Sequence, residues 1–188
     1  MHRRCVIVLA TAALFGCQHE ATTRVSAPLV PSQSVMKAPT TEETLEFFNH
    51  LSGRLDVQLS EPPHQVSERI VNLVAPPTAR LKNVKLRMEV FVHNGDAITF
   101  RELRAEEWNW VAIRAPRMRM RGWGKNVVEH IAPNSESFTV RDLTNAVEET
   151  ERKTRGSSEW LDGIDVHHTF FEGIHLEEDG VWSIYWGS

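Results

Sequence analysis

Helical and alternating spacings of apolar residues predict most of the secondary structure of this chain. Residues 40–51 place apolar side chains three to four positions apart and begin with acidic residues, so they predict an amphipathic helix. Residues 84–92 alternate between apolar and polar side chains, which predicts a half-buried strand. Residues 67–74 predict a second helix, because their apolar residues would share one face and the prolines that follow would end it.

The same short capping pattern occurs twice, at residues 98–103 and 138–143. Each copy has an apolar residue, then a threonine that can cap a helix, then an acidic residue and a leucine at the third and fourth helical positions. Both copies therefore predict helix starts. The second helix is predicted to run to residue 155, whereas the first gives way to a strand at residues 108–113.

The C-terminal residues predict a β-hairpin. Residues 164–176 are rich in β-branched and aromatic side chains, residues 181–186 alternate, and Asp179 and Gly180 between them suit a tight turn. Together these elements predict an α+β fold with a single domain. In that fold an antiparallel sheet with a C-terminal β-hairpin packs against roughly two to four helices.

The first residues of the chain carry a targeting pattern. Two arginines precede an uncharged, largely apolar run from residue 5 to residue 15, and Gly16 and Cys17 follow. A membrane-spanning helix needs about 20 apolar residues, so this run is too short and is typical of a signal peptide. The segment Leu-Phe-Gly-Cys at residues 14–17 resembles the lipobox of bacterial lipoproteins.

This resemblance implies that lipid is attached to Cys17 and that the chain is cut just before it. The sequence then divides into a signal peptide at residues 1–16, a lipidated cysteine with a flexible tether at residues 17–40, and a globular α+β domain at residues 41–188. The expected location is the bacterial cell envelope, with the domain in the periplasm or at the cell surface and bound to the membrane through its lipid. The alternatives are a plain secretory signal that is cut elsewhere, with Cys17 incidental, and a short buried helix.

The composition narrows the classes of function. The 188-residue chain has a formal net charge of −4, which argues against nucleic acid as a partner. It has only two cysteines, of which Cys5 would leave with the signal and Cys17 would be blocked by lipid. Cysteine nucleophiles, thiolate metal sites and redox pairs are then excluded. No cofactor other than the covalent lipid is predicted.

A run of histidine and glutamate near the C-terminus is the strongest candidate for chemistry. On a helix, His168, Glu172 and His175 would lie on one face, where they could converge on a zinc-like ion. The threonine, valine and phenylalanine residues around them favour a strand, in which His168 and Glu172 lie roughly 13 Å apart. A metal site would then need another histidine, such as His93 or His130, and a metal is not expected.

Two chemical alternatives remain beside plain hydrogen bonding within a half-buried sheet. In the first, His168 and Glu172 act as general base and general acid. In the second, a metal ion is held by three histidines, which are His167, His168 and His175.

Basic residues concentrate in the middle of the chain and acidic residues in its C-terminal third. Arg117, Arg119 and Arg121 alternate with methionines, so an extended strand would place the three arginines on one face, and Trp123 follows them. This strip could bind an anionic glycan or an envelope protein. The alternative is that acidic residues of the C-terminal third pair with it.

Familiar motifs of nucleotide-binding proteins, serine hydrolases and zinc proteases are absent from the sequence. We therefore expect a lipid-anchored envelope protein with a non-enzymatic binding or assembly domain. The alternative function is a small-ligand, metal-binding or hydrolytic pocket at the C-terminal hairpin that uses His168 and Glu172.

Replacing Cys17 with serine tests the predicted anchor. The Cys17→Ser variant should lose metabolic labelling by a fatty acid, because the cysteine sulfur that carries the lipid is gone. Labelling is measured on the purified protein, with Cys5→Ser as a matched control that should be labelled like the unaltered chain. Labelling that persists in Cys17→Ser would contradict the prediction.

Overall fold

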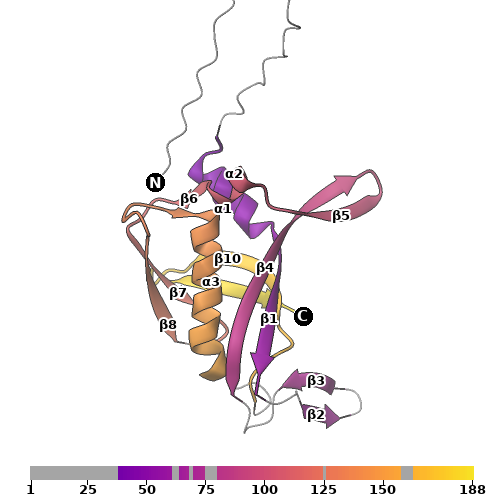
Figure 1. Ribbon diagram of the computed structural model, residues 1–188. Helices are drawn as coiled ribbons and strands as arrows, with labels where there is room; N and C mark the ends of the chain where they lie inside the picture. Colours follow the sequence, from indigo (N-terminus) through magenta and orange to yellow (C-terminus); the bar gives the residue numbers. More distant parts are fainter. Residues whose placement is uncertain (1–37, 61–63, 68–69, 75–79, 125, 158–162) are drawn as a thin grey trace, which may run out of the picture. The chain divides into compact units, whose positions relative to one another are not determined.

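The computed structural model describes residues 38–188 apart from 61–63, 68–69, 75–79, 125 and 158–162 (Figure 1). The lipobox and Cys17 lie outside the described residues. In chain order the elements are α1 (Thr41–Asn49), β1 (Ser52–Leu59), β2 (His64–Ser67), β3 (Ile70–Val74), β4 (Leu81–Asn94), β5 (Ala97–Glu102), α2 (Ala105–Trp108), β6 (Val111–Ile113), β7 (Arg117–Arg121), β8 (Val127–Ile131), β9 (Phe138–Thr139), α3 (Val140–Thr154), a 3₁₀ turn (Arg155–Ser157), β10 (Phe170–Leu176) and β11 (Trp182–Gly187).

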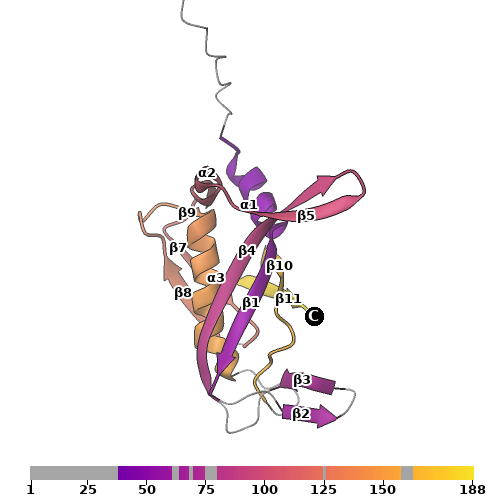
Figure 2. The same ribbon diagram turned by 45° about the vertical axis from the view of Figure 1, so that its right-hand side comes forward.

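A seven-stranded sheet in the order β5-β4-β1-β10-β11-β7-β8 forms the body of the fold. Its neighbouring strands are antiparallel except for β11 and β7, which run parallel, so the sheet is mixed rather than purely antiparallel. The sheet curves around α3, which contacts β4 on one side and β7 and β8 on the other (Figures 1 and 2). The predicted α+β fold with a C-terminal hairpin is confirmed.

The capping signals that predict the first and last helices are confirmed. Thr40 accepts a hydrogen bond from the Glu43 amide at 3.2 Å, and the Glu43 carboxylate accepts one from the Thr40 amide at 2.7 Å. Thr139 and Asp142 make the same reciprocal pair at the start of α3. These caps satisfy amide groups that have no partner inside the helix.

Two predicted helices are wrong. Residues 67–74 include the last residue of β2 and the whole of β3 instead of a helix, because their β-branched residues suit paired strands and the antiparallel register of β2 with β3 supplies the partners. Residues 98–102 fall in β5, because Gly95 adopts a φ of 63° and turns the chain back along β4. The helix start moves to Arg104, where the Glu107 carboxylate accepts the Arg104 amide at 2.8 Å.

The apolar core lies between α3 and the concave face of the sheet. Alternation on β1 and β4 turns one set of side chains inward, and the apolar stripe of α3 meets them. Fully buried side chains dominate this contact. They include Phe48, Val84, Met120, Phe138, Val140, Leu143 and Val147.

A buried ion pair at the end of α3 is hydrogen-bonded to the last strand, β11. Glu151 and Arg155 are fully buried, and Arg155 Nε donates to Glu151 Oε2 at 2.7 Å. The other oxygen of Glu151 accepts from Trp186 Nε1 at 2.9 Å and from the Trp123 amide at 2.8 Å. A Cβ at Gly122 would overlap the carboxylate, so glycine is needed for this close approach.

Removing Glu151 should be costly because it leaves the Arg155 guanidinium buried without its carboxylate. We expect Glu151→Ala to lower the free energy of unfolding by about 3–5 kcal/mol. The matched control is Lys153→Ala, which breaks the exposed pair between Lys153 and Glu149 at the same helical spacing and should cost less than about 1 kcal/mol. Urea denaturation measures both, and similar losses would contradict the assigned role of burial.

Candidate functional site

A buried aspartate organises the histidines that the sequence singles out. Asp165 is fully buried, and its Oδ1 accepts hydrogen bonds from the amides of His167 at 2.7 Å and His168 at 3.0 Å. His168 Nδ1 lies 2.7 Å from Asp165 Oδ2, and Arg155 donates to the backbone carbonyls of Asp165 and His168. Trp123, predicted to belong to the arginine strip, instead stacks on the His168 ring at 4.4 Å. A carboxylate that fixes an imidazole in this way is also how many general bases are oriented.

The structure does not bring the other predicted residues into this cluster. His167 meets the His168 ring edge to face at 5.2 Å, whereas His175 packs against Tyr185 at 5.1 Å. The Glu172 carboxylate lies against Gly187 on β11. In the part of the chain that the structure describes, no group of three His, Cys, Asp or Glu side chains could hold a metal ion.

The arginine strip on β7 has the predicted alternation and is largely neutralised by neighbouring acids. Arg117 pairs with Glu129 on β8 at 3.6 Å, and Arg121 pairs with Asp179 in the β10–β11 turn at 2.8 Å. Arg119 stands opposite Glu129 in the strand register. The hydrogen bond from Arg121 holds the pKa of the Asp179 carboxyl below its ordinary value. This arrangement is the pairing that the sequence leaves open as the alternative to ligand binding.

The C-terminal part of β4 and the N-terminal part of β5 form an exposed apolar ribbon. β1 begins at Ser52, which stands opposite Glu89, so residues 90–94 of β4 are paired only with β5. Phe91 and Phe100 face each other across this ribbon with ring centroids 5.0 Å apart, and they are 45% and 51% exposed. Ile98 is 57% exposed. Figures 1 and 2 show the ribbon projecting from the body of the sheet.

The base of this ribbon is held by a buried carboxylate. Arg101 on β5 donates to both oxygens of Glu107 on α2, at 2.7 and 2.6 Å. The Arg101 hydrogen bond keeps the pKa of Glu107 below its ordinary value despite burial. The ribbon therefore leaves the body of the domain in a defined direction.

A groove of about 600 Å³ lies between the ribbon and the end of α1, and we name it the ribbon groove. Asn49 fixes the end of α1, because its side chain bonds the backbone amide and carbonyl of Ile174 at 2.9 and 3.1 Å. The groove is lined mainly by apolar side chains from both elements. They are Phe47, Leu51, Val90, Phe91, Ile98 and Phe171, together with the more polar Asn49, His50 and His93.

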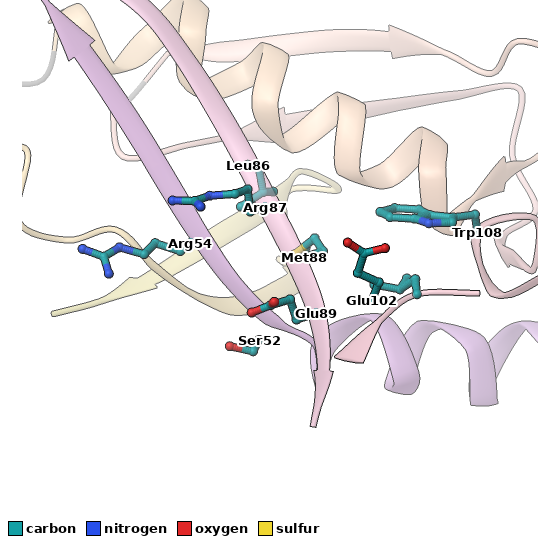
Figure 3. A pocket seen from close by; sticks show the side chains of 9 residues that line it. Ser52, Arg54, Leu86, Arg87, Met88, Glu89, Glu102 and Trp108 are labelled. Atoms are coloured by element: carbon teal, nitrogen blue, oxygen red, sulfur yellow. The ribbon is translucent and has the colours of Figure 1, made fainter. Parts of the chain in front are cut away.

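A second hollow of about 530 Å³, which we name the charged cleft, follows β4 at the point where β5 leaves it (Figure 3). Arg54 on β1 stands opposite Arg87 on β4, and Glu89 stands opposite Glu102 on β5. The lining is completed by Ser52, Leu86, Met88, Leu103 and Trp108.

The remaining candidate histidines do not join His168. His93 lines the ribbon groove, and His130 lines a hollow of about 360 Å³ between β8 and α3. The buried His130 Nε2 lies 2.8 Å from Thr150 Oγ1, and its Nδ1 lies 3.6 Å from the Glu149 carboxylate. Burial lowers the pKa of His130, although Glu149 partly opposes this shift.

The sequence does not predict the ribbon groove or the charged cleft, because it predicts residues 98–103 as a helix start rather than as a strand. The Asn94–Gly95 turn after the alternating strand predicts that the chain reverses there. The missed signal is the second apolar segment, which contains Ile98 and Phe100 and can serve as the returning strand of a hairpin. A prediction of this hairpin would also have predicted that its aromatic side chains are exposed on the strand pair.

Comparisons with known proteins found no matching protein family, no matching curated protein and no matching solved structure. None of the helices within the described ranges has the length and apolar character required to cross a membrane.

The lowered pKa of His130 predicts a specific pH dependence of stability. The folded state takes up this proton less readily than the unfolded state, so the free energy of unfolding should fall as the pH drops below about 6.5. The slope from this group should reach at most about 1.4 kcal/mol per pH unit. Carboxylates with lowered pKa values, such as Glu107, add their loss only at lower pH.

Replacing His130 separates its contribution to the pH dependence of stability from that of the other titratable groups. Urea denaturation between about pH 7.5 and pH 5.5 should show a shallower pH dependence for His130→Gln than for the unaltered protein. Asn145→Gln, which changes a side chain of the same hollow that does not titrate, should leave the slope unchanged. An unchanged slope in His130→Gln would show that the histidine does not cause it.

Proposed function

We propose that this protein is a lipid-anchored component of the bacterial envelope whose folded domain is a non-enzymatic binding module. Its ribbon groove takes an extended, apolar segment of another envelope protein. The observation that carries the proposal is the projecting β4–β5 ribbon, with exposed Phe91, Ile98 and Phe100 beside the groove.

The ribbon has the character of a surface that is completed by a partner. Isolated two-stranded ribbons are marginally stable in water, and grouped exposed apolar residues commonly mark interaction sites. Here the aromatic pair of Phe91 and Phe100 lies on the part of β4 that β1 does not reach. A partner that covers these rings would remove apolar area from water, at about 25 cal/mol per Å².

A polypeptide suits this surface better than a lipid does. β5 is the terminal strand of the sheet as far as the structure describes it, so one row of its backbone N–H and C=O groups faces away from β4. Only another chain can bond such a row in register, while its alternate side chains enter an apolar groove. The segment Ala97–Phe100 has no proline or charged residue that would block such pairing.

The predicted anchor would keep this surface near the membrane. Residues 18–37 lie between Cys17 and Ala38, the first described residue. The described chain enters the domain at α1, whose last residues line the ribbon groove. A partner in or on the same membrane would therefore meet the groove at a high effective concentration.

The hydrolytic alternative at the C-terminal hairpin stays a prediction. The Asp165–His168 pair has the geometry of an oriented base, but Glu172 lies against Gly187 rather than beside it. The Asp165 carboxylate also bonds two backbone amides, which is the role of a residue that shapes a turn.

Site-specific cross-linking in intact cells tests the ribbon groove. A photoreactive amino acid at Thr99 should cross-link to an apolar segment of one envelope protein, identified by mass spectrometry of the linked peptides. The double variant Phe91→Ser/Phe100→Ser should reduce the yield about tenfold or more, because it removes the aromatic contacts. Tyr185→Ser is the matched control, since Tyr185 on β11 is as exposed as Phe91.

Three results would overturn this assignment. They are cross-links only to lipid, cross-links only to a second copy of this chain, and a yield that the double variant leaves unchanged. Support requires, in addition, that the identified segment protects β5 amides from hydrogen exchange when it is added to the purified protein as a peptide.

A further inference from the structure

Asn94 and Gly95 lie at the far end of the β4–β5 ribbon (Figures 1 and 2). Asn94 is the strand partner of Ala97, so Gly95 and Asp96 form a two-residue turn between them. Gly95 has a φ of 63°, and a Cβ built there would meet no atom of the described residues within 4 Å. The main chain that follows Asn94 is therefore open to solvent and unobstructed.

The protein does not hold the Asn94 side chain, although it holds similar side chains elsewhere. Asn94 is exposed, and its amide group makes no hydrogen bond within the described ranges. The Asn134 side chain accepts two backbone amides at 2.9 and 2.8 Å and donates to Ser137 at 2.9 Å. Asp179, which also precedes a glycine in a hairpin turn, accepts from the Val181 amide at 3.0 Å and from Arg121 at 2.8 Å.

The ribbon permits local movement at its end. Residues 90–94 of β4 are paired only with β5, and the pair of Asn94 with Ala97 is the last before the turn. The end of a two-stranded ribbon opens at a much smaller cost in free energy than the whole domain does. The backbone at Asn94 can therefore rotate while the body of the domain stays folded.

From these observations we infer that Asn94 is a site of spontaneous deamidation. The main-chain nitrogen of Gly95 attacks Cγ of Asn94 and forms a new C–N bond. The bond between Cγ and the side-chain nitrogen breaks, and that nitrogen leaves as ammonia with the proton that the Gly95 nitrogen gives up. Glycine favours the attack because it has no Cβ beside the nitrogen, and the reacting groups are already joined in one chain.

The cyclic imide that forms is opened by water at either of its two carbonyl groups. Attack at the side-chain carbonyl gives aspartate, and attack at the main-chain carbonyl gives isoaspartate. In both cases ammonia is lost, one water is consumed, and nothing is oxidised or reduced. Each product places a carboxylate next to Asp96, at the tip of the apolar ribbon.

The isoaspartate product should loosen the ribbon. Its chain continues through Cγ, which adds one carbon to the main chain at the residue that pairs with Ala97. Strand register depends on the length of the turn, so this insertion disrupts the pairing of β4 with β5 at the tip. The reaction is a property of the turn and does not depend on the partner proposed for the ribbon groove.

Storage of the purified protein at mildly alkaline pH tests the assignment. Digests are analysed by mass spectrometry, with fragmentation that distinguishes aspartate from isoaspartate. Both products are expected at Asn94. Conversion there should be at least about tenfold faster than at Asn134 in the same sample, because three hydrogen bonds hold the Asn134 side chain.

Asn94→Gln is the matched variant, because its longer side chain would have to close a less favourable six-membered ring. It should remain unconverted. After storage, the β5 amides of the unaltered protein should exchange with deuterium at least about tenfold faster than before, whereas those of stored Asn94→Gln should not change.

The inference is overturned if Asn94 stays intact while a synthetic peptide of residues 90–100 is converted, since the fold would then protect it. Equal rates at Asn94 and Asn134 would also overturn it. Equal acceleration of β5 exchange in stored Asn94→Gln would overturn the assigned effect on the ribbon. None of these results decides whether the ribbon groove binds its proposed partner.

Discussion

The arrangement of this domain depends on one buried carboxylate. Glu151 on α3 holds Arg155 in the 3₁₀ turn that follows, and it also accepts hydrogen bonds from the backbone at Trp123 and from the indole of Trp186. Because an uncompensated charge is so unfavourable in the interior, all three partners must be in place together. The helix, the chain that follows β7 and the last strand are thereby fixed around a common centre. Through Arg155 the same centre reaches the carbonyls beside His168.

Unequal strand lengths explain why the ribbon groove and the charged cleft lie next to each other along β4. β4 has 14 residues and β1 has 8, so β4 continues past its neighbour and only β5 accompanies it. The part of β4 that extends past β1 lines the ribbon groove, and the charged cleft lies where β5 ends beside β4. The ion pair between Arg101 and Glu107 holds the base of this extension against the rest of the domain.

Much of the fold could be predicted from the sequence where local physics decides the structure. The caps at Thr40 and Thr139 and the alternation of β4 are properties of neighbouring residues, and the structure confirms them. The segment containing Ile98 has the same capping pattern, yet it forms a strand because β4 supplies a partner that no local rule contains. The candidate surfaces escape prediction for the same reason. The Arg54–Arg87 and Glu89–Glu102 pairs exist only through strand register, and the residues of each pair are far apart or separated by a turn in the chain.

The bond between Asn49 and Ile174 gives the domain a mechanical property. The chain enters at α1, and the Asn49 side chain clips the end of that helix to the backbone of β10 at a point 125 residues further along. A pull on the N-terminal side is therefore carried into the centre of the sheet rather than peeling away a peripheral helix. There β10 is flanked by β1 and β11, so the load is shared by hydrogen bonds that must shear together. The ribbon groove, which the last residues of α1 line, would keep its shape under such a load.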